Sequence, residues 1–105
     1  MYKVIVFVPI ESKESLKEAM FDAGAGKIGA YDQCCFETEG VGQFRPLKGS
    51  SPAIGTQDSV EYVREMKVEM VVEDENITAV LSAMKRAHPY EEVAYDVFKH
   101  AQIDF

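Results

Sequence analysis

The residues best suited to chemistry are gathered at positions 88–92, where the sequence reads His-Pro-Tyr-Glu-Glu. A neutral imidazole can ligate a metal ion or transfer a proton, and a neighbouring carboxylate can share the ion or orient the ring. His88, Glu91 and Glu92 are therefore the candidate ligands for a divalent metal ion. The alternative is structural, because a histidine near a helix C-terminus is favoured by the helix dipole and a following proline is a common stop signal.

The remaining metal-binding residue types do not form a familiar ligand pattern. Cys34 and Cys35 are adjacent, which fits neither a Cys-x-x-Cys zinc site nor an unstrained disulfide. His88 and His100 are twelve residues apart and do not share a helical face. We therefore expect any metal site to be weak unless a second chain completes it, and we expect the cysteines to be one small buried residue and one more exposed thiol.

Residues 24–29 spell Gly-Ala-Gly-Lys-Ile-Gly, which has the G-x-G-x-x-G spacing of dinucleotide sites. That motif works only where it leaves a strand and opens a helix, so that the helix N-terminus meets the pyrophosphate. Here the glycines follow a predicted helix, and Ile28 stands where a phosphate loop has Ser or Thr. This segment predicts a helix-to-strand connection.

A second glycine-rich segment, residues 40–55, has the composition of a long loop. Long loops in small domains are often functional or form interfaces. Its backbone N–H groups can surround an anion, and the segment can equally dock against a neighbouring subunit. The candidate interface or ligand residues in it are Gly40, Gly42, Phe44, Pro46, Gly49, Pro52 and Gly55.

These segments are positioned by six predicted elements. The apolar patterns predict strands at 3–9, 31–39, 65–72 and 93–98, and helices at 13–23 and after Asn76 as far as Pro89, with Ser12 and Asn76 as N-caps. The order β-α-β-β-α-β indicates an α+β, ferredoxin-like fold, in which two helices cover one face of a four-stranded antiparallel sheet. The predicted core is Leu16, Met20, Met66, Val68, Met70, Val80, Leu81 and Met84.

The first strand is apolar on both faces, with Val4, Val6 and Val8 on one and Ile5 and Phe7 on the other. Such a pattern is typical of a strand covered on both sides. Because the helices cover only one face of this sheet, the other face predicts contact with a second chain. We therefore expect a homo-oligomer.

Size and charge exclude several classes of function. The 105 residues suffice for a single domain, 1–105, and the net charge of −7 argues against binding to nucleic acid or to an anionic membrane surface. No run of 18 apolar residues exists, and the five-residue apolar run at 4–8 is too short for a signal peptide. A cytoplasmic protein is expected.

Three segments together resemble the inserted domain of the Nif-three-like family, whose members are also labelled as resembling GTP cyclohydrolase. They are residues 24–29, residues 40–47 with 52–55, and residues 88–96, so the resemblance spans nearly the whole chain. The resemblance implies a PII/CutA-like module that helps to assemble an oligomer. Residues 88–91 also resemble the corresponding segment of CutA proteins, which are trimers linked to divalent-ion tolerance, although 92–94 depart from the Val-Pro-Glu usual there.

The resemblance favours an oligomeric binding or regulatory module, with a trimer as the first expectation, rather than an enzyme. The family's dinuclear metal centre is built by a flanking domain, whose residues this chain lacks, so a stand-alone module is expected. The alternative is a weak divalent-metal-binding protein or metal-dependent enzyme that uses His88 with Glu91 or Glu92 at a subunit interface. A third hypothesis is an accessory subunit that docks onto a separately encoded metal-binding domain.

Overall fold

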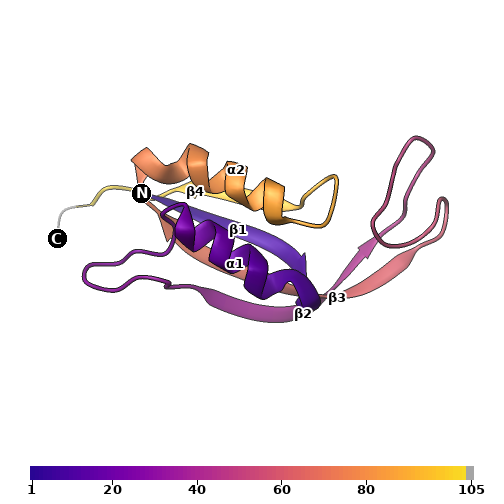
Figure 1. The fold of residues 1–105 in the computed structure, drawn as a ribbon, viewed down its shortest axis with the longest axis horizontal. Coiled ribbons are helices and arrows are strands. Elements are labelled where there is room, and N and C mark those ends of the chain that lie inside the picture. Colours follow the sequence, from indigo (N-terminus) through magenta and orange to yellow (C-terminus); the bar gives the residue numbers. More distant parts are fainter. Residues whose placement is uncertain (104–105) are drawn as a thin grey trace.

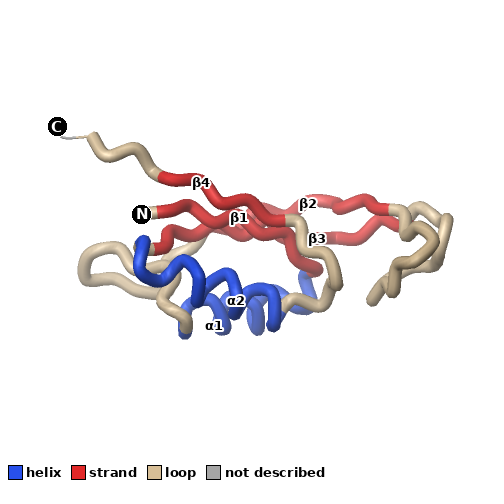
Figure 2. The backbone as a smooth tube through the Cα atoms, turned by 90° about the horizontal axis from the view of Figure 1, so that it is seen from above, coloured by secondary structure: helices blue, strands red, loops and turns tan. Residues whose placement is uncertain are grey.

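The computed structural model describes residues 1–103, which form one sheet and one layer of helices (Figure 1). The elements are β1 (Tyr2–Pro9), the 3-10 helix η1 (Ile10–Ser12), α1 (Lys13–Asp22), β2 (Phe36–Phe44), β3 (Glu61–Val72), the 3-10 helix η2 (Asp74–Asn76), α2 (Ile77–Ala87) and β4 (Tyr95–Lys99). The sheet is antiparallel with strand order β2-β3-β1-β4, and both helices lie on one face (Figure 2). The predicted ferredoxin-like α+β fold is confirmed. Neither α-helix of the described chain combines the length and the apolar content needed to span a bilayer.

The core lies between the helices and the face of the sheet that carries Val4, Val6 and Val8, which are fully buried. Register places these valines opposite Met70, Val68 and Met66 of β3, so both central strands contribute to one layer. Six of the eight predicted core residues are buried, and Met66 and Leu81 pack partly buried against them. Each fully buried side chain of this kind contributes about 1.5–3 kcal/mol of transfer free energy, which explains why the helices adhere to this face.

The opposite face of the sheet carries no layer of helices within the described chain. Side chains alternate along a strand, so Ile5 and Phe7 point away from the helices, and both are only half-buried. On the same face, Phe36 and Phe98 at the two edge strands are 67% and 55% exposed. The apolar pattern of the first strand is therefore satisfied on one side only.

β2 differs most from the prediction. The strand was expected at 31–39 but runs from Phe36 to Phe44, so the first part of the predicted 40–55 loop is strand. Gly40 and Gly42 pair with Glu65 and Val63 of β3, which begins at Glu61 rather than at position 65. A Cβ at Gly42 would overlap the Glu65 carboxylate, so a neighbouring side chain occupies the space that glycine leaves open in this strand. The last strand is also shifted, to Tyr95–Lys99 instead of 93–98.

The helix ends are as predicted, but the N-caps work differently. Ser12 and Asn76 occupy the N-cap positions, yet neither side chain makes a capping hydrogen bond. Each helix is instead preceded by a 3-10 turn, in which the N–H groups of Lys13 and Ile77 donate to the carbonyls of Ile10 and Asp74. α2 ends at Ala87, and the extended conformation of His88 before Pro89 is the one that proline favours.

The glycines at 24–29 connect α1 to the sheet, as predicted, and do not open a helix. Gly26 has a φ of +77°, and its N–H donates to the Val71 carbonyl at 2.8 Å. A Cβ there would lie 2.7 Å from the carbonyl oxygen of Cys34, so only glycine fits. The adjacent cysteines are free, and both are half-buried, so the expected division into one buried and one exposed thiol is wrong. Cys35 packs against the core, where burial raises the pKa of its thiol.

Candidate ligand pocket

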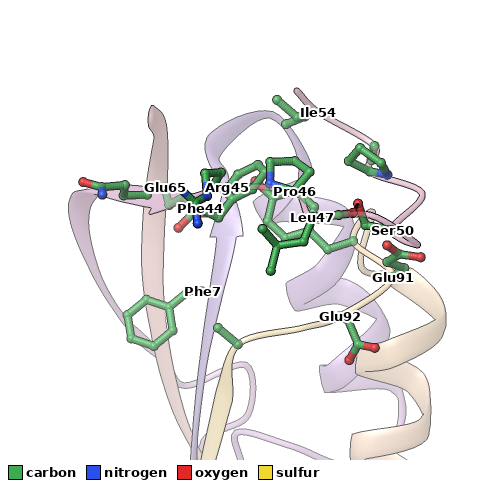
Figure 3. A pocket seen from close by; sticks show the side chains of 15 residues that line it. Phe7, Phe44, Arg45, Pro46, Leu47, Ser50, Ile54, Glu65, Glu91 and Glu92 are labelled. Carbon is green, nitrogen blue, oxygen red and sulfur yellow. Dashed lines mark hydrogen bonds between the residues drawn. The ribbon is translucent and has the colours of Figure 1, made fainter. Parts of the chain in front are cut away.

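A cavity of about 410 Å³ lies where the segment between β2 and β3 meets the segment between α2 and β4 (Figure 3). These are the two segments that the sequence singled out for function. The cavity is lined by Phe7 of β1, Gln43 and Phe44 of β2, Glu65 of β3, residues 45–47, 50 and 52–54 of the first segment, and Tyr90, Glu91, Glu92 and Ala94 of the second. Four stretches of chain distant in sequence thus share one pocket.

Apolar groups make up most of the pocket wall. Phe44 and Tyr90 meet edge to face, with ring centroids 5.7 Å apart. Pro46, Leu47 and Ile54 extend the wall from the loop side (Figure 3). An apolar wall with a few polar groups is typical of a small-molecule site.

The buried side chain of His88 holds two residues of this wall, Phe7 and Tyr90, through their backbones. The ring is 6% exposed, and its Nδ1 accepts a hydrogen bond of 3.1 Å from the Tyr90 backbone N–H. Because Nδ1 accepts, the ring proton is assigned to Nε2, which donates to the Phe7 carbonyl at 2.7 Å. Both ring nitrogens are therefore committed to the backbone, and they fix the segment after α2 to β1.

Tyr90 carries the next connection. Its hydroxyl donates to the Glu65 carboxylate over 3.2 Å, which links the segment after α2 to β3. Burial, together with the negative charge and the hydrogen bond of Glu65, raises the pKa of Tyr90 to about 12. The phenol is thus neutral at physiological pH and remains a donor.

A single hydrogen bond joins the two segments across the mouth of the pocket. The Ser51 N–H donates to Glu91 Oε1 at 2.8 Å. The loop that presents Ser51 is held by its own bonds, from the Asp58 N–H to the Pro46 carbonyl at 2.7 Å and from Ser50 Oγ to the Leu47 carbonyl at 2.7 Å. The pocket is therefore shaped before a ligand arrives.

The candidate metal ligands are not assembled into a site within one chain. Among residues 1–103 no group of three or more His, Cys, Asp or Glu side chains is placed to hold an ion. His88 has both nitrogens in use, Glu91 accepts from Ser51, and Glu92 is exposed. A site completed by a second chain stays a prediction.

The candidate interface or ligand residues fall into three groups. Phe44, Pro46 and Pro52 line the pocket. Gly49 and Gly55 adopt positive φ values of +97° and +90° in the loop, while Gly40 and Gly42 lie in β2. Phe7 and Glu65 also line the pocket and were not predicted. Only the strand register, which pairs Pro9 with Glu65, brings the end of β1 beside this part of β3.

Known proteins are similar to this chain in both sequence and fold. It is 44% identical over 98 residues to a GTP cyclohydrolase 1 type 2 homolog of Halalkalibacterium halodurans, a match that covers 93% of this chain and 26% of the relative. The homolog of the same name in Bacillus subtilis is 46% identical over 96 residues, covering 91% and 26%. The crystal structure of a Bacillus cereus protein related to NIF3 is 43% identical with a TM-score of 0.79, and the match covers 92% of this chain and 24% of that one. The chain is a homologue of one segment of the NIF3-like proteins.

The NIF3-like relationship rests on these pairwise matches, since no family model matches the chain. The chain spans about a quarter of the length of the curated relatives that it matches. CutA1 from Pyrococcus horikoshii shares the fold at 14% identity, with a TM-score of 0.69 over 99% of this chain and 87% of CutA1. The chain thus has a CutA-like fold, as the resemblance implied.

Proposed function

We propose that the chain is an oligomeric PII/CutA-like binding module that takes a small ligand in the pocket between residues 45–54 and 90–94. The observation that carries this proposal is the pocket itself, preformed by the hydrogen bond from the Ser51 N–H to Glu91 and walled by aromatic rings. A preformed cavity binds without the cost of ordering a loop, which is the main advantage of preorganisation.

The hydrogen bonds of the pocket favour binding over catalysis. His88 is the residue of the 88–92 segment best suited to proton transfer, and both its nitrogens bond the backbone. The phenol of Tyr90 is directed to Glu65, and its raised pKa opposes its use as a base near neutral pH. These groups hold the shape of the wall.

The uncovered face of the sheet supports assembly with further copies of the chain. Register places Phe36, Glu69, Ile5 and Asp96 in one row across β2, β3, β1 and β4, and Lys67 and Phe7 in the next. Apolar groups therefore alternate with charges of both signs, a pattern that a second copy of the same face can complement.

Two measurements test the proposal. Screening of small organic molecules by ¹H–¹⁵N NMR should yield ligands that shift the amides of Ser51, Tyr90 and their neighbours. The substitution Ala53→Trp, which fills the pocket from its exposed loop, should abolish those shifts, whereas Ala79→Trp on the exposed face of α2 should not. Ligands that act equally on both variants would contradict the pocket assignment.

Assembly is tested by sedimentation equilibrium. Wild type should exceed the 11.7 kDa of a single chain, and Ile5→Glu should return it to that mass. Val41→Glu, on the opposite face of β2, is the matched control and should leave the mass unchanged. A wild-type protein that sediments only as single chains at micromolar concentration would contradict the oligomer.

A further inference from the structure

The charges around the pocket are unequal. Glu65, Glu91 and Glu92 line it together with one basic residue, Arg45. The whole chain carries −7, so the surrounding field reinforces the local excess of negative charge. An anionic ligand would have to enter against both.

The carboxylates are also only partly used by the protein. Glu91 accepts a hydrogen bond from the Ser51 N–H through Oε1, and Glu65 accepts one from the Tyr90 hydroxyl through Oε2. Within the described chain, the exposed Glu92 side chain forms no hydrogen bond or ion pair, and it lies at the edge of the pocket with its carboxylate directed away from Pro46 and Leu47 (Figure 3). Free acceptor oxygens therefore remain at the mouth.

The loop between β2 and β3 does not offer the Ser51 N–H as a donor to an anion. The Ser51 N–H, which closes over the mouth, is already taken by the chain's own Glu91 carboxylate. The aromatic rings of Phe7, Phe44 and Tyr90 lie on the same cavity and suit the apolar part of a ligand. The interior therefore favours an apolar group, and the mouth favours a positive charge.

We infer that the pocket selects an organic cation, in which an apolar body lies among Phe44, Leu47 and Phe7 and the negative charge of Glu65, Glu91 and Glu92 attracts an ammonium or guanidinium group to the mouth. This inference rests on the proposed function, because it names the class of ligand that the pocket takes. It replaces the anion site considered for the loop, since the one N–H that closes the mouth is internally bonded.

A shape-matched series of probes tests the inference by NMR titration. The probes are 2-phenylethylammonium, neutral 2-phenylethanol and anionic phenylacetate. We expect the cation to bind at least about tenfold more tightly than the alcohol, phenylacetate to bind most weakly, and the preference to shrink several-fold when salt rises from low to high concentration. Equal affinity for the three probes, or a preference for the anion, would overturn the inference while leaving a binding pocket in place. Failure of all three probes to shift pocket amides, when the fragment screen finds no other ligand, would overturn the proposed function itself.

Charge variants sharpen the test because they act in opposite directions. Glu92→Gln should weaken 2-phenylethylammonium about three- to tenfold without changing 2-phenylethanol, and Arg45→Gln should strengthen the cation. Glu18→Gln removes an equal charge from the exposed face of α1 and is the control. A Glu92→Gln variant that behaves like Glu18→Gln would overturn the assignment of Glu92.

Discussion

His88 offers the sharpest test of how the pocket wall is held. The side chain is 6% exposed, and it bonds the Phe7 carbonyl and the Tyr90 N–H, which belong to segments 81 and 2 residues away. His88→Ala removes both bonds and leaves a buried donor and a buried acceptor. With about 1 kcal/mol for each bond and a further penalty for the unsatisfied partners, the free energy of unfolding should fall by about 2–4 kcal/mol.

Two conservative variants divide this loss. The amide oxygen of Asn can take the place of Nδ1, so His88→Asn should keep the bond from Tyr90 and lose the one to Phe7. The amide nitrogen of Gln can take the place of Nε2, so His88→Gln should do the reverse. Each should lose roughly half of the alanine effect, about 1–2 kcal/mol.

The assay is urea unfolding at one fixed protomer concentration, because assembly makes apparent stability depend on concentration. His100→Ala is the control, since that half-buried ring makes no hydrogen bond in the described chain, and it should change stability by less than about 0.5 kcal/mol. If His88→Ala were as mild as His100→Ala, the two hydrogen bonds of His88 would not be what holds the pocket wall.

Three further predictions concern charged and titrating groups. Of the five tyrosines, Tyr90 should ionise near pH 12 in an absorbance titration, and Tyr90→Phe should remove this late component. Because the pKa of Tyr90 is raised in the folded state, the stability that it contributes should be lost between about pH 10 and 12. An unchanged absorbance titration in Tyr90→Phe would contradict the burial of Tyr90 against Glu65. Burial alone would raise the pKa of Glu37, but hydrogen bonds from Lys13 and Lys17 hold it below its ordinary 4.5. Glu37→Gln should therefore lower the free energy of unfolding by about 0.5–1 kcal/mol at pH 7, and this difference from wild type should vanish as the pH falls below 4.5. A constant difference across that range would count against this ion pair. Any zinc binding through His88 requires displacement of a backbone partner, so calorimetry should give at most a weak isotherm that is lost in Glu91→Gln/Glu92→Gln; identical isotherms for wild type and variant would remove these carboxylates as ligands.

The sequence predicted the elements whose signal is local. Alternation at 66–72 and the helical spacing of Leu16, Met20, Val80 and Met84 identified one strand and two buried faces correctly. The proline at 89 marked the end of α2. In the strand and the helices, buried side chains recur with the period of the element, so the pattern can be read from residues close together in the sequence.

The errors have a non-local cause. Gly40 and Gly42 have the composition of a loop, but hydrogen bonds to residues 63–65 make them part of β2. The side chains of Ser12 and Asn76 make no capping bond, and the helix starts are joined instead to the backbone turns η1 and η2, in which the N–H groups of Lys13 and Ile77 donate to carbonyls. Backbone partners of this kind cannot be recognised from composition alone.

The sequence indicated which segments form the pocket but not how these segments contact one another. Both flanking segments stood out by residue type, yet the bonds that build the wall join Phe7 to His88 across 81 residues and Glu65 to Tyr90 across 25. The candidate metal ligand His88 proved to be part of this support. Residue types indicated where function lies, and the strand register determined what kind of site results.

Intermolecular NOEs between the chain and a bound 2-phenylethylammonium ion, or the best ligand of the fragment screen, locate the binding site on the molecule. A ligand in the pocket should give NOEs from its apolar protons to the ring protons of Phe7, Phe44 and Tyr90. NOEs confined to Ile5, Phe36 or Phe98, on the uncovered face of the sheet, would contradict the account.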